Sequence, residues 1–225
     1  MRSSTHAAPA GDRELLALLG ARRAHLVARE GRRGDAKLLC QRALADTEDD
    51  RGRGELYLLL GTLQAETGDA EARASLLQAR EFALRAGSAP LSGRALLALG
   101  ALAVQTGELD RARVHFTDAA VALGDGDQRG AAIAVFGLGV VADAAGATRD
   151  AVARFEHALA SFREAGERIG EAQALHALVA PLRAAGDYVG AEAAAAESRT
   201  RLAELGERPR DAADALAALA LSLPG

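Results

Sequence analysis

Apolar residues recur at intervals of three and four positions along most of this 225-residue chain. That spacing places them on one face of an α-helix. Residues 93–124 show it twice, once on each side of Gly107, and glycine tolerates the left-handed conformation that ends a helix. The two stripes are Leu96, Leu99, Leu102 and Ala103, then Ala112, Phe116, Ala119 and Leu123. The segment therefore predicts a helical hairpin.

The same pattern of helix, glycine and helix occurs five times. The turn glycines are 37, 39, 39 and 40 residues apart, at Gly31, Gly68, Gly107, Gly146 and Gly186. A fixed period of this size is typical of a repeat array, in which each hairpin buries its apolar face against the next one. We therefore expect five hairpins over residues 12–209, stacked as one cooperative domain.

Two details support this interpretation. Gly61, Gly100 and Gly139 lie in the middle of first helices, where glycine costs about 1 kcal/mol relative to alanine, so their repetition predicts close helix contacts. Residues that commonly cap helices also precede the predicted starts. The candidate caps are Asp12, Asp35, Asp50, Asp69, Ser88, Thr148, Asp187 and Asp211.

The two ends of the chain differ from the repeats. Residues 1–11 contain no apolar core of a signal peptide, and we expect them to form a disordered leader. Residues 210–225 contain one more helix with no partner helix after it, and we expect this helix to cap the open end of the stack. Pro181 lies inside a predicted helix and should kink or break it.

Composition agrees with an all-α fold. Apolar residues make up 49% of the chain but aromatic residues only 3%, so the core must consist mainly of alanine, leucine and valine. Alanine and leucine are strong helix formers, and isoleucine, which strands prefer, occurs only at positions 133 and 169.

The repeat resembles the tetratricopeptide repeat (TPR). Its marks here are Leu-Gly, a glycine seven residues later, then an alanine, a phenylalanine and a second alanine at fixed spacing. They stand at Leu99, Gly100, Gly107, Ala112, Phe116 and Ala119, and again at Leu138, Gly139, Gly146, Ala151, Phe155 and Ala158. The period exceeds the usual 34 or so residues. The longer form is similar to repeats of bacterial regulators and signalling ATPases.

The resemblance implies a right-handed α-solenoid whose first helices line a concave groove. The positions that it places in the groove and that we expect to contact a partner are Leu58, Thr62, Arg94, Leu97, Ala101, Ile133, Phe136, Val140, Asp143, His176 and Arg183. Gln173 and Ala180 also map to the inner wall. The basic and amide side chains with which some members clamp a carboxylate terminus are absent from the matching positions.

The middle of this predicted groove is apolar, which leaves two alternatives. The groove receives an apolar helix or extended peptide of a partner, or it is covered by the leader, by a second copy of the chain or by tight closure of the superhelix.

The charge and the cysteine content limit which partners and which compartment we expect. The net charge is −4 and aromatic residues are scarce, which disfavours nucleic acid. No apolar run is long enough to span a membrane. Cys40 is the only cysteine, so no disulfide can form within the chain, and we expect a cytoplasmic protein.

No motif predicts catalysis, a cofactor or a metal. The run GLGVVA at 137–142 matches a dinucleotide fingerprint but lies in a helical pattern rather than after a strand. The histidines are scattered, and Cys40 takes the position of a core phenylalanine. We therefore expect a non-enzymatic scaffold that binds a protein or peptide, such as an amphipathic helix, in a bacterial regulatory or assembly role. The alternative is the arm of a regulator that senses a metabolite or lipid-like ligand.

Overall fold

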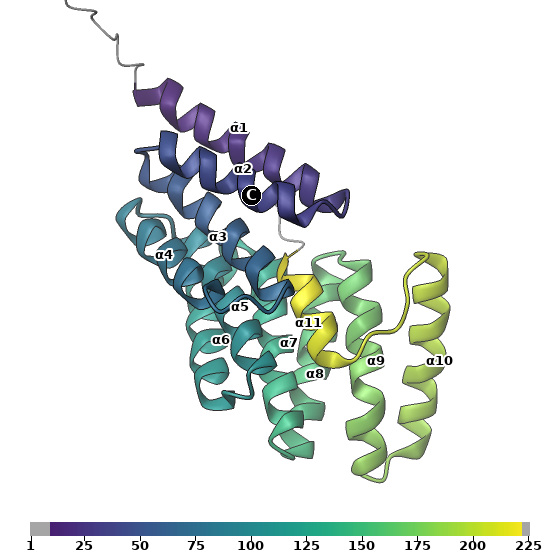
Figure 1. Ribbon diagram of the computed structural model, residues 1–225. Helices are drawn as coiled ribbons and strands as arrows, with labels where there is room; N and C mark the ends of the chain where they lie inside the picture. The colour runs from purple at the N-terminus through teal and green to yellow at the C-terminus, as the bar shows by residue number, and fades with distance from the viewer. Residues whose placement is uncertain (1–9, 222–225) are drawn as a thin grey trace, which may run out of the picture. The chain divides into compact units, whose positions relative to one another are not determined.

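The computed structural model describes residues 10–221, and within them all regular structure is helical (Figure 1). The helices are α1 (Ala10–Arg29), α2 (Arg33–Asp46), α3 (Asp50–Glu66), α4 (Ala72–Arg85), α5 (Ala89–Gln105), α6 (Leu109–Leu123), α7 (Gln128–Ala144), α8 (Thr148–Glu164), α9 (Arg168–Ala184), α10 (Tyr188–Glu204) and α11 (Ala212–Leu221), with a short 3-10 turn η1 (Gly124–Gly126). The prediction of an all-α solenoid of five hairpins is confirmed.

Each repeat glycine ends the first helix of its hairpin. At Gly107 the backbone φ is 74°, and at Gly146 it is 72°, a region that side chains with a Cβ rarely adopt. The amide of the following residue closes the turn, as where Ala147 N–H donates to the carbonyl of Ala142 at 2.9 Å. The 39-residue period is therefore the length of one hairpin with its two turns.

The glycines in the middle of first helices make the close contacts that the sequence predicts. A Cβ at Gly61 would lie 2.7 Å from Cγ of Leu76, and one at Gly139 would lie 2.7 Å from Cδ1 of Phe155. The mid-helix glycines of α3, α5 and α7 thus each face one large residue of the paired helix, which is Leu76 for Gly61, Phe116 for Gly100 and Phe155 for Gly139.

The described chain divides into two compact units, one up to Ser92 and one from Gly93. The first unit has a small core of Ala24, Cys40, Leu56 and Leu60, in which α1, α2 and α3 pack together. The second unit has a larger core, built around four fully buried phenylalanines. These are Phe116, Phe136, Phe155 and Phe162.

Helix caps agree only partly with the predicted set. Asp187 and Asp211 each accept a hydrogen bond at 2.8 Å from the amide three residues later. Asp49 caps α3 and Asp127 caps α7 in the same way, at 2.5 Å and 2.8 Å. Asp35, Asp50 and Thr148 instead lie inside helices. An acidic pair such as Asp49-Asp50 offers two possible caps, and the sequence pattern does not distinguish them.

Three expectations about particular segments change. α1 begins at Ala10, inside the stretch expected to be a leader, and residues 1–9 lie outside the described part of the chain. Pro181 does not break α9, which continues to Ala184. It lies in the last turn, where Ala185 N–H still donates to the Pro181 carbonyl at 2.9 Å. The last helix is present but lies elsewhere than predicted.

Candidate functional site

The site lies in the second unit, on the face of α7 and α9 against which α11 packs and which we call the inner face (Figure 1). α7 and α9 are the first helices of successive hairpins, the helices that were expected to line the groove. α11 follows α10 in sequence but turns back across these two helices. From the sequence we expect α11 over the open end of the stack, whereas its contacts in the structure are with α7 and α9.

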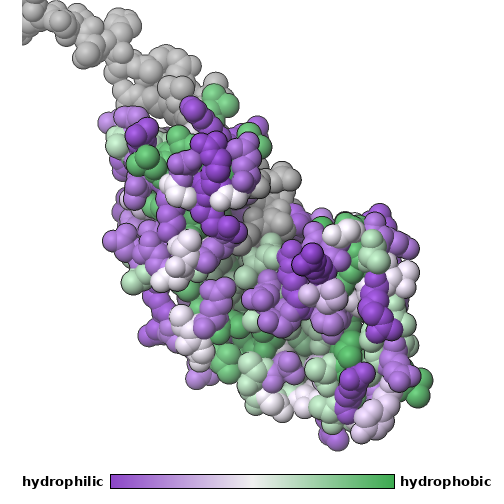
Figure 2. Space-filling view, turned by 45° about the vertical axis from the view of Figure 1, so that its right-hand side comes forward, coloured by the Kyte–Doolittle hydropathy of each residue, from purple (hydrophilic) through white to green (hydrophobic). Residues whose placement is uncertain are grey.

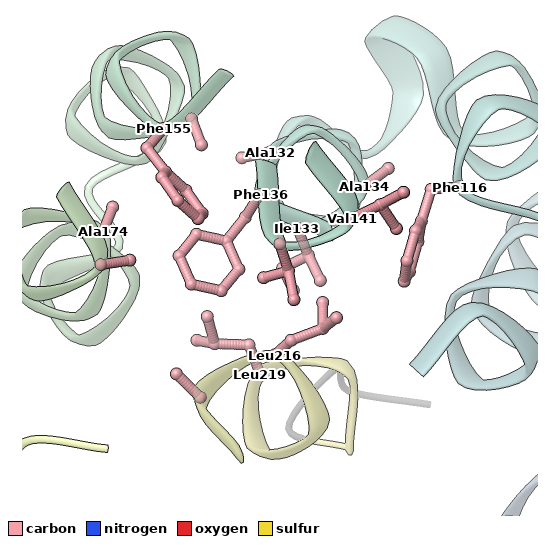
Figure 3. Packing of buried hydrophobic residues seen from close by; sticks show 14 of the residues in the cluster. Phe116, Ala132, Ile133, Ala134, Phe136, Val141, Phe155, Ala174, Leu216 and Leu219 are labelled. Atoms are coloured by element: carbon pink, nitrogen blue, oxygen red, sulfur yellow. The ribbon is translucent and has the colours of Figure 1, made fainter. Parts of the chain in front are cut away.

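Leucines of α11 point into the middle of this inner face. Leu216 and Leu219 lie beside Ile133 and Phe136 of α7 (Figure 3), and all four side chains are buried. Ala215 is buried as well, and its small side chain lets the helices approach. Two of the apolar positions that the sequence assigns to a partner, Ile133 and Phe136, are thus covered by the chain's own C-terminal helix (Figure 3).

The segment that leads into α11 is held by Gln173, a side chain of α9 that is only 1% exposed. Its Nε2 donates to the carbonyl oxygen of Arg208 at 3.2 Å, and its Oε1 accepts from the backbone N–H of Arg210 at 3.4 Å. Both ends of the amide are therefore satisfied by backbone atoms two residues apart.

The packing of α11 is centred on two leucines. Burying a leucine contributes about 1.5–3 kcal/mol, and Leu216 and Leu219 are the two leucines of α11 in the buried core. A helix of ten residues is too short to be stable alone in water. Asp211 caps its first turn. α11 thus depends on the inner face for its structure.

The predicted site residues behave differently from one another. Ile133, Phe136 and Val140 are buried, and Leu97 and Ala101 belong to the same core. Arg94 and His176 are half-buried and Arg183 is exposed. Asp143 is exposed at the end of α7, where partial desolvation raises the pKa of its carboxyl. Leu58 and Thr62 belong to the first unit, so a groove that combines the whole set stays a prediction.

Thr62 has a role within its own helix. Its side chain is buried, and its hydroxyl donates to the carbonyl of Leu59 at 2.8 Å. Leu58 beside it is half-buried. The structure therefore gives Thr62 a partner inside α3 that the sequence pattern did not anticipate.

A charged network fixes α9 between its neighbours. The buried carboxylate of Glu171 accepts from Nε of Arg163 at 2.7 Å and from Nη1 of Arg201 at 3.1 Å. Glu197 on α10 bonds the same two arginines, and the hydrogen bond from Arg201 lowers the pKa of its carboxyl. These ion pairs join α8, α9 and α10 and so keep Gln173 in position.

The surface around the site carries both apolar and polar side chains (Figure 2). On the face of the second unit seen in Figure 2, apolar surface lies between polar side chains. Across residues 10–221 no helix is both long and apolar enough to cross a membrane. No group of three or more histidine, cysteine or acidic side chains in that part of the chain could hold a metal ion.

Comparison with solved structures shows which known folds this chain resembles. The chain is similar to BtubC (BKLC) from P. vanneervenii, with a TM-score of 0.70 and 22% identity over 83% of this chain and 81% of that one. It is also similar to TPR-like repeats of a putative kinesin light chain from Podosopora anserina. A single-substitution form of that protein gives a TM-score of 0.67 and 14% identity over 86% of this chain and 97% of that one. A second structure gives a TM-score of 0.65 and 14% identity over 87% of this chain and 99% of that one.

These likenesses define the class of protein. The fold is that of the TPR-like helical repeat proteins, as the spacing of glycine, alanine and phenylalanine predicts. No protein-family model and no curated protein sequence matches the chain. The identities are low, so the comparison concerns the fold, and the function must be argued from the site.

Proposed function

We propose that this protein is a non-catalytic interaction scaffold that binds an apolar helix of another protein on the inner face of α7 and α9. The observation that supports this proposal is α11 itself, because an apolar helix already packs there with Leu216 and Leu219 against Ile133 and Phe136. Shape and chemistry on this face therefore suit a helix.

The role that fits such a scaffold is organising an assembly or regulator in the bacterial cytoplasm. A TPR-like array presents an extended surface rather than a deep reactive cleft. The buried thiol of Cys40 adds no nucleophile, because desolvation raises its pKa to about 12.

Photo-crosslinking in cells tests the proposal. A benzophenone amino acid is placed at His176, which is half-buried on α9, and in a control at Val114, which is exposed on α6. We expect the first position to form an adduct with one protein, through a short segment rich in leucine and alanine. We expect the control position to form none with that protein.

Two results would contradict the proposal. The first is the same adduct pattern at both positions. The second is a small molecule retained by the full chain in native mass spectrometry and lost in Phe136→Glu, which would favour the alternative of a ligand-sensing arm.

A further inference from the structure

α11 shows how the inner face recognises a helix. The face receives a pair of adjacent residues, Ala215 and Leu216, and a further leucine three positions later at Leu219. These side chains lie on one stripe of the helix because residues three and four apart share a face. The helix is preceded by a non-helical segment, residues 205–211, whose backbone Gln173 holds.

The contacts of Gln173 do not depend on which side chains the segment carries. The amide bonds a carbonyl and an N–H that are two residues apart, and every chain without proline at the second position offers this pair. A buried amide that loses both bonds is costly to leave unsatisfied. If residues 205–211 leave, Gln173 therefore favours another backbone in the same place.

Exchange is feasible because α11 is short and is joined to α10 by a non-helical segment. Its departure would expose Ile133 and Phe136, which are fully buried, and exposed apolar surface of this kind favours a replacement of similar shape. A partner would then have to compete with α11, which has the advantage of a high effective concentration because it is attached to the chain.

We propose that the partner carries a segment that copies residues 208–219, and that it binds only by displacing α11. Its features are an extended stretch held by Gln173, then a short helix with the spacing of Ala215, Leu216 and Leu219. This inference rests on the function proposed above and adds both the chemistry of the partner and the control of its access. α11 acts as a built-in competitor.

The test uses the full-length chain with α11 disabled by Leu216→Asp and Leu219→Asp, which we call the opened variant. The probe is a fluorescein-labelled peptide of residues 205–221, followed by fluorescence anisotropy. We expect the opened variant to bind it at least tenfold more tightly than the wild type does, because its own α11 no longer competes. A peptide with both leucines changed to aspartate is the matched control and should not bind.

A third substitution tests the role of Gln173. In the opened variant, Gln173→Ala should weaken binding of the peptide about 25-fold, the value of roughly two hydrogen bonds at about fivefold each. A peptide with Arg210→Pro lacks the one N–H that Gln173 accepts, so its binding to the opened variant should weaken about fivefold. Unchanged binding in both cases would show that Gln173 does not hold the partner's backbone.

A form of the protein with a protease site provides a second test if the opened variant does not fold. A protease site inserted between Gly206 and Glu207 lets the native chain fold before α11 is cut from it. After cleavage the labelled peptide should exchange into the inner face, and before cleavage it should not. Failure of the peptide to bind both the folded opened variant and the cut chain would overturn the proposal.

The outcomes separate this inference from the function on which it rests. Peptide binding without any crosslinked protein at position 176 in cells would support the recognition mode but contradict the scaffold role. A crosslinked protein with no peptide binding would leave the scaffold role and remove the idea that α11 imitates the partner. Dimerisation of the wild type through α11, seen as a doubled mass, would instead identify a second copy as the occupant.

Discussion

Gly100 of α5 leaves the space that the ring of Phe116 in α6 occupies. A Cβ at Gly100 would lie 2.4 Å from Cε1 of Phe116, and one at Gly137 of α7 would lie 2.7 Å from the same atom. The ring is therefore enclosed by two glycines on two different helices. This contact joins the third hairpin to the fourth.

Gly100→Ala should destabilise the second unit, although alanine is the better helix former. Overpacking a core costs about 1–3 kcal/mol, which exceeds the gain of about 1 kcal/mol in helix propensity for all but the smallest clashes. Urea denaturation followed by circular dichroism measures the change. The loss of stability caused by Gly100→Ala should be smaller when Phe116→Leu is also present. The control is Gly34→Ala, which should be neutral or stabilising because nothing lies within 4 Å of the added Cβ.

Leu216→Ala should loosen α11 without unfolding the hairpins. The lost packing, about 2 kcal/mol, corresponds to roughly 30-fold faster hydrogen exchange in residues 212–221. The control is Phe155→Ala, whose ring is fully buried between hairpin helices and whose loss should cost about 3–5 kcal/mol of global stability. Equal effects on global unfolding would mean that α11 and the hairpins unfold as one unit.

Gln173→Ala should release the segment before α11. The carbonyl of Arg208 and the amide of Arg210 lose their partner, so exchange at Arg210 and in the first turn of α11 should accelerate. Exchange in α3 and α4, which belong to the other unit, is the internal reference. Protection that stays the same in residues 205–215 would show that the leucines alone fix α11.

Cys40 should make the first unit sensitive to alkali. Desolvation raises the pKa of the folded thiol to about 12, whereas an unfolded thiol titrates near 8.5. Its stabilising effect is therefore complete below about pH 8.5 and falls by about 1.4 kcal/mol per pH unit as the pH rises toward 12.

The matched comparison for that prediction is Cys40→Ala. Denaturation curves at pH 8 and pH 10 should converge for the two proteins as the pH rises, because alanine has no proton to lose. A difference between them that stays constant with pH would contradict a buried protonated thiol. Reaction with a thiol reagent at pH 8 should be slow in the native protein and fast once it is unfolded.

The repeats were predictable because their signals are local and recur. Gly107 and Gly146 mark turns whatever the rest of the chain does, and the pairing of Gly139 with Phe155 repeats that of Gly100 with Phe116. Five copies of a weak pattern together define the hairpins, since each copy supports the same alignment.

The place of α11 was not predictable in the same way. Its sequence, with alanine or leucine at most positions, has no polar side that would show which face is buried. The direction in which it returns is set by residues 205–211 and by the two bonds of Gln173, which join positions 35 and 37 residues apart. The one usable signal was Gln173, an amide at a position that the sequence maps to the inner wall.

The return of α11 also restricts how this gene can change. Helical arrays commonly gain or lose whole hairpins, and a hairpin added after α10 would carry α11 one repeat farther from α7. Its leucines would then meet a different set of side chains, and Ile133 and Phe136 would lose their cover. In evolution the number of hairpins and the sequence of the tail are therefore linked, so homologues with an altered repeat count should also carry an altered or missing tail.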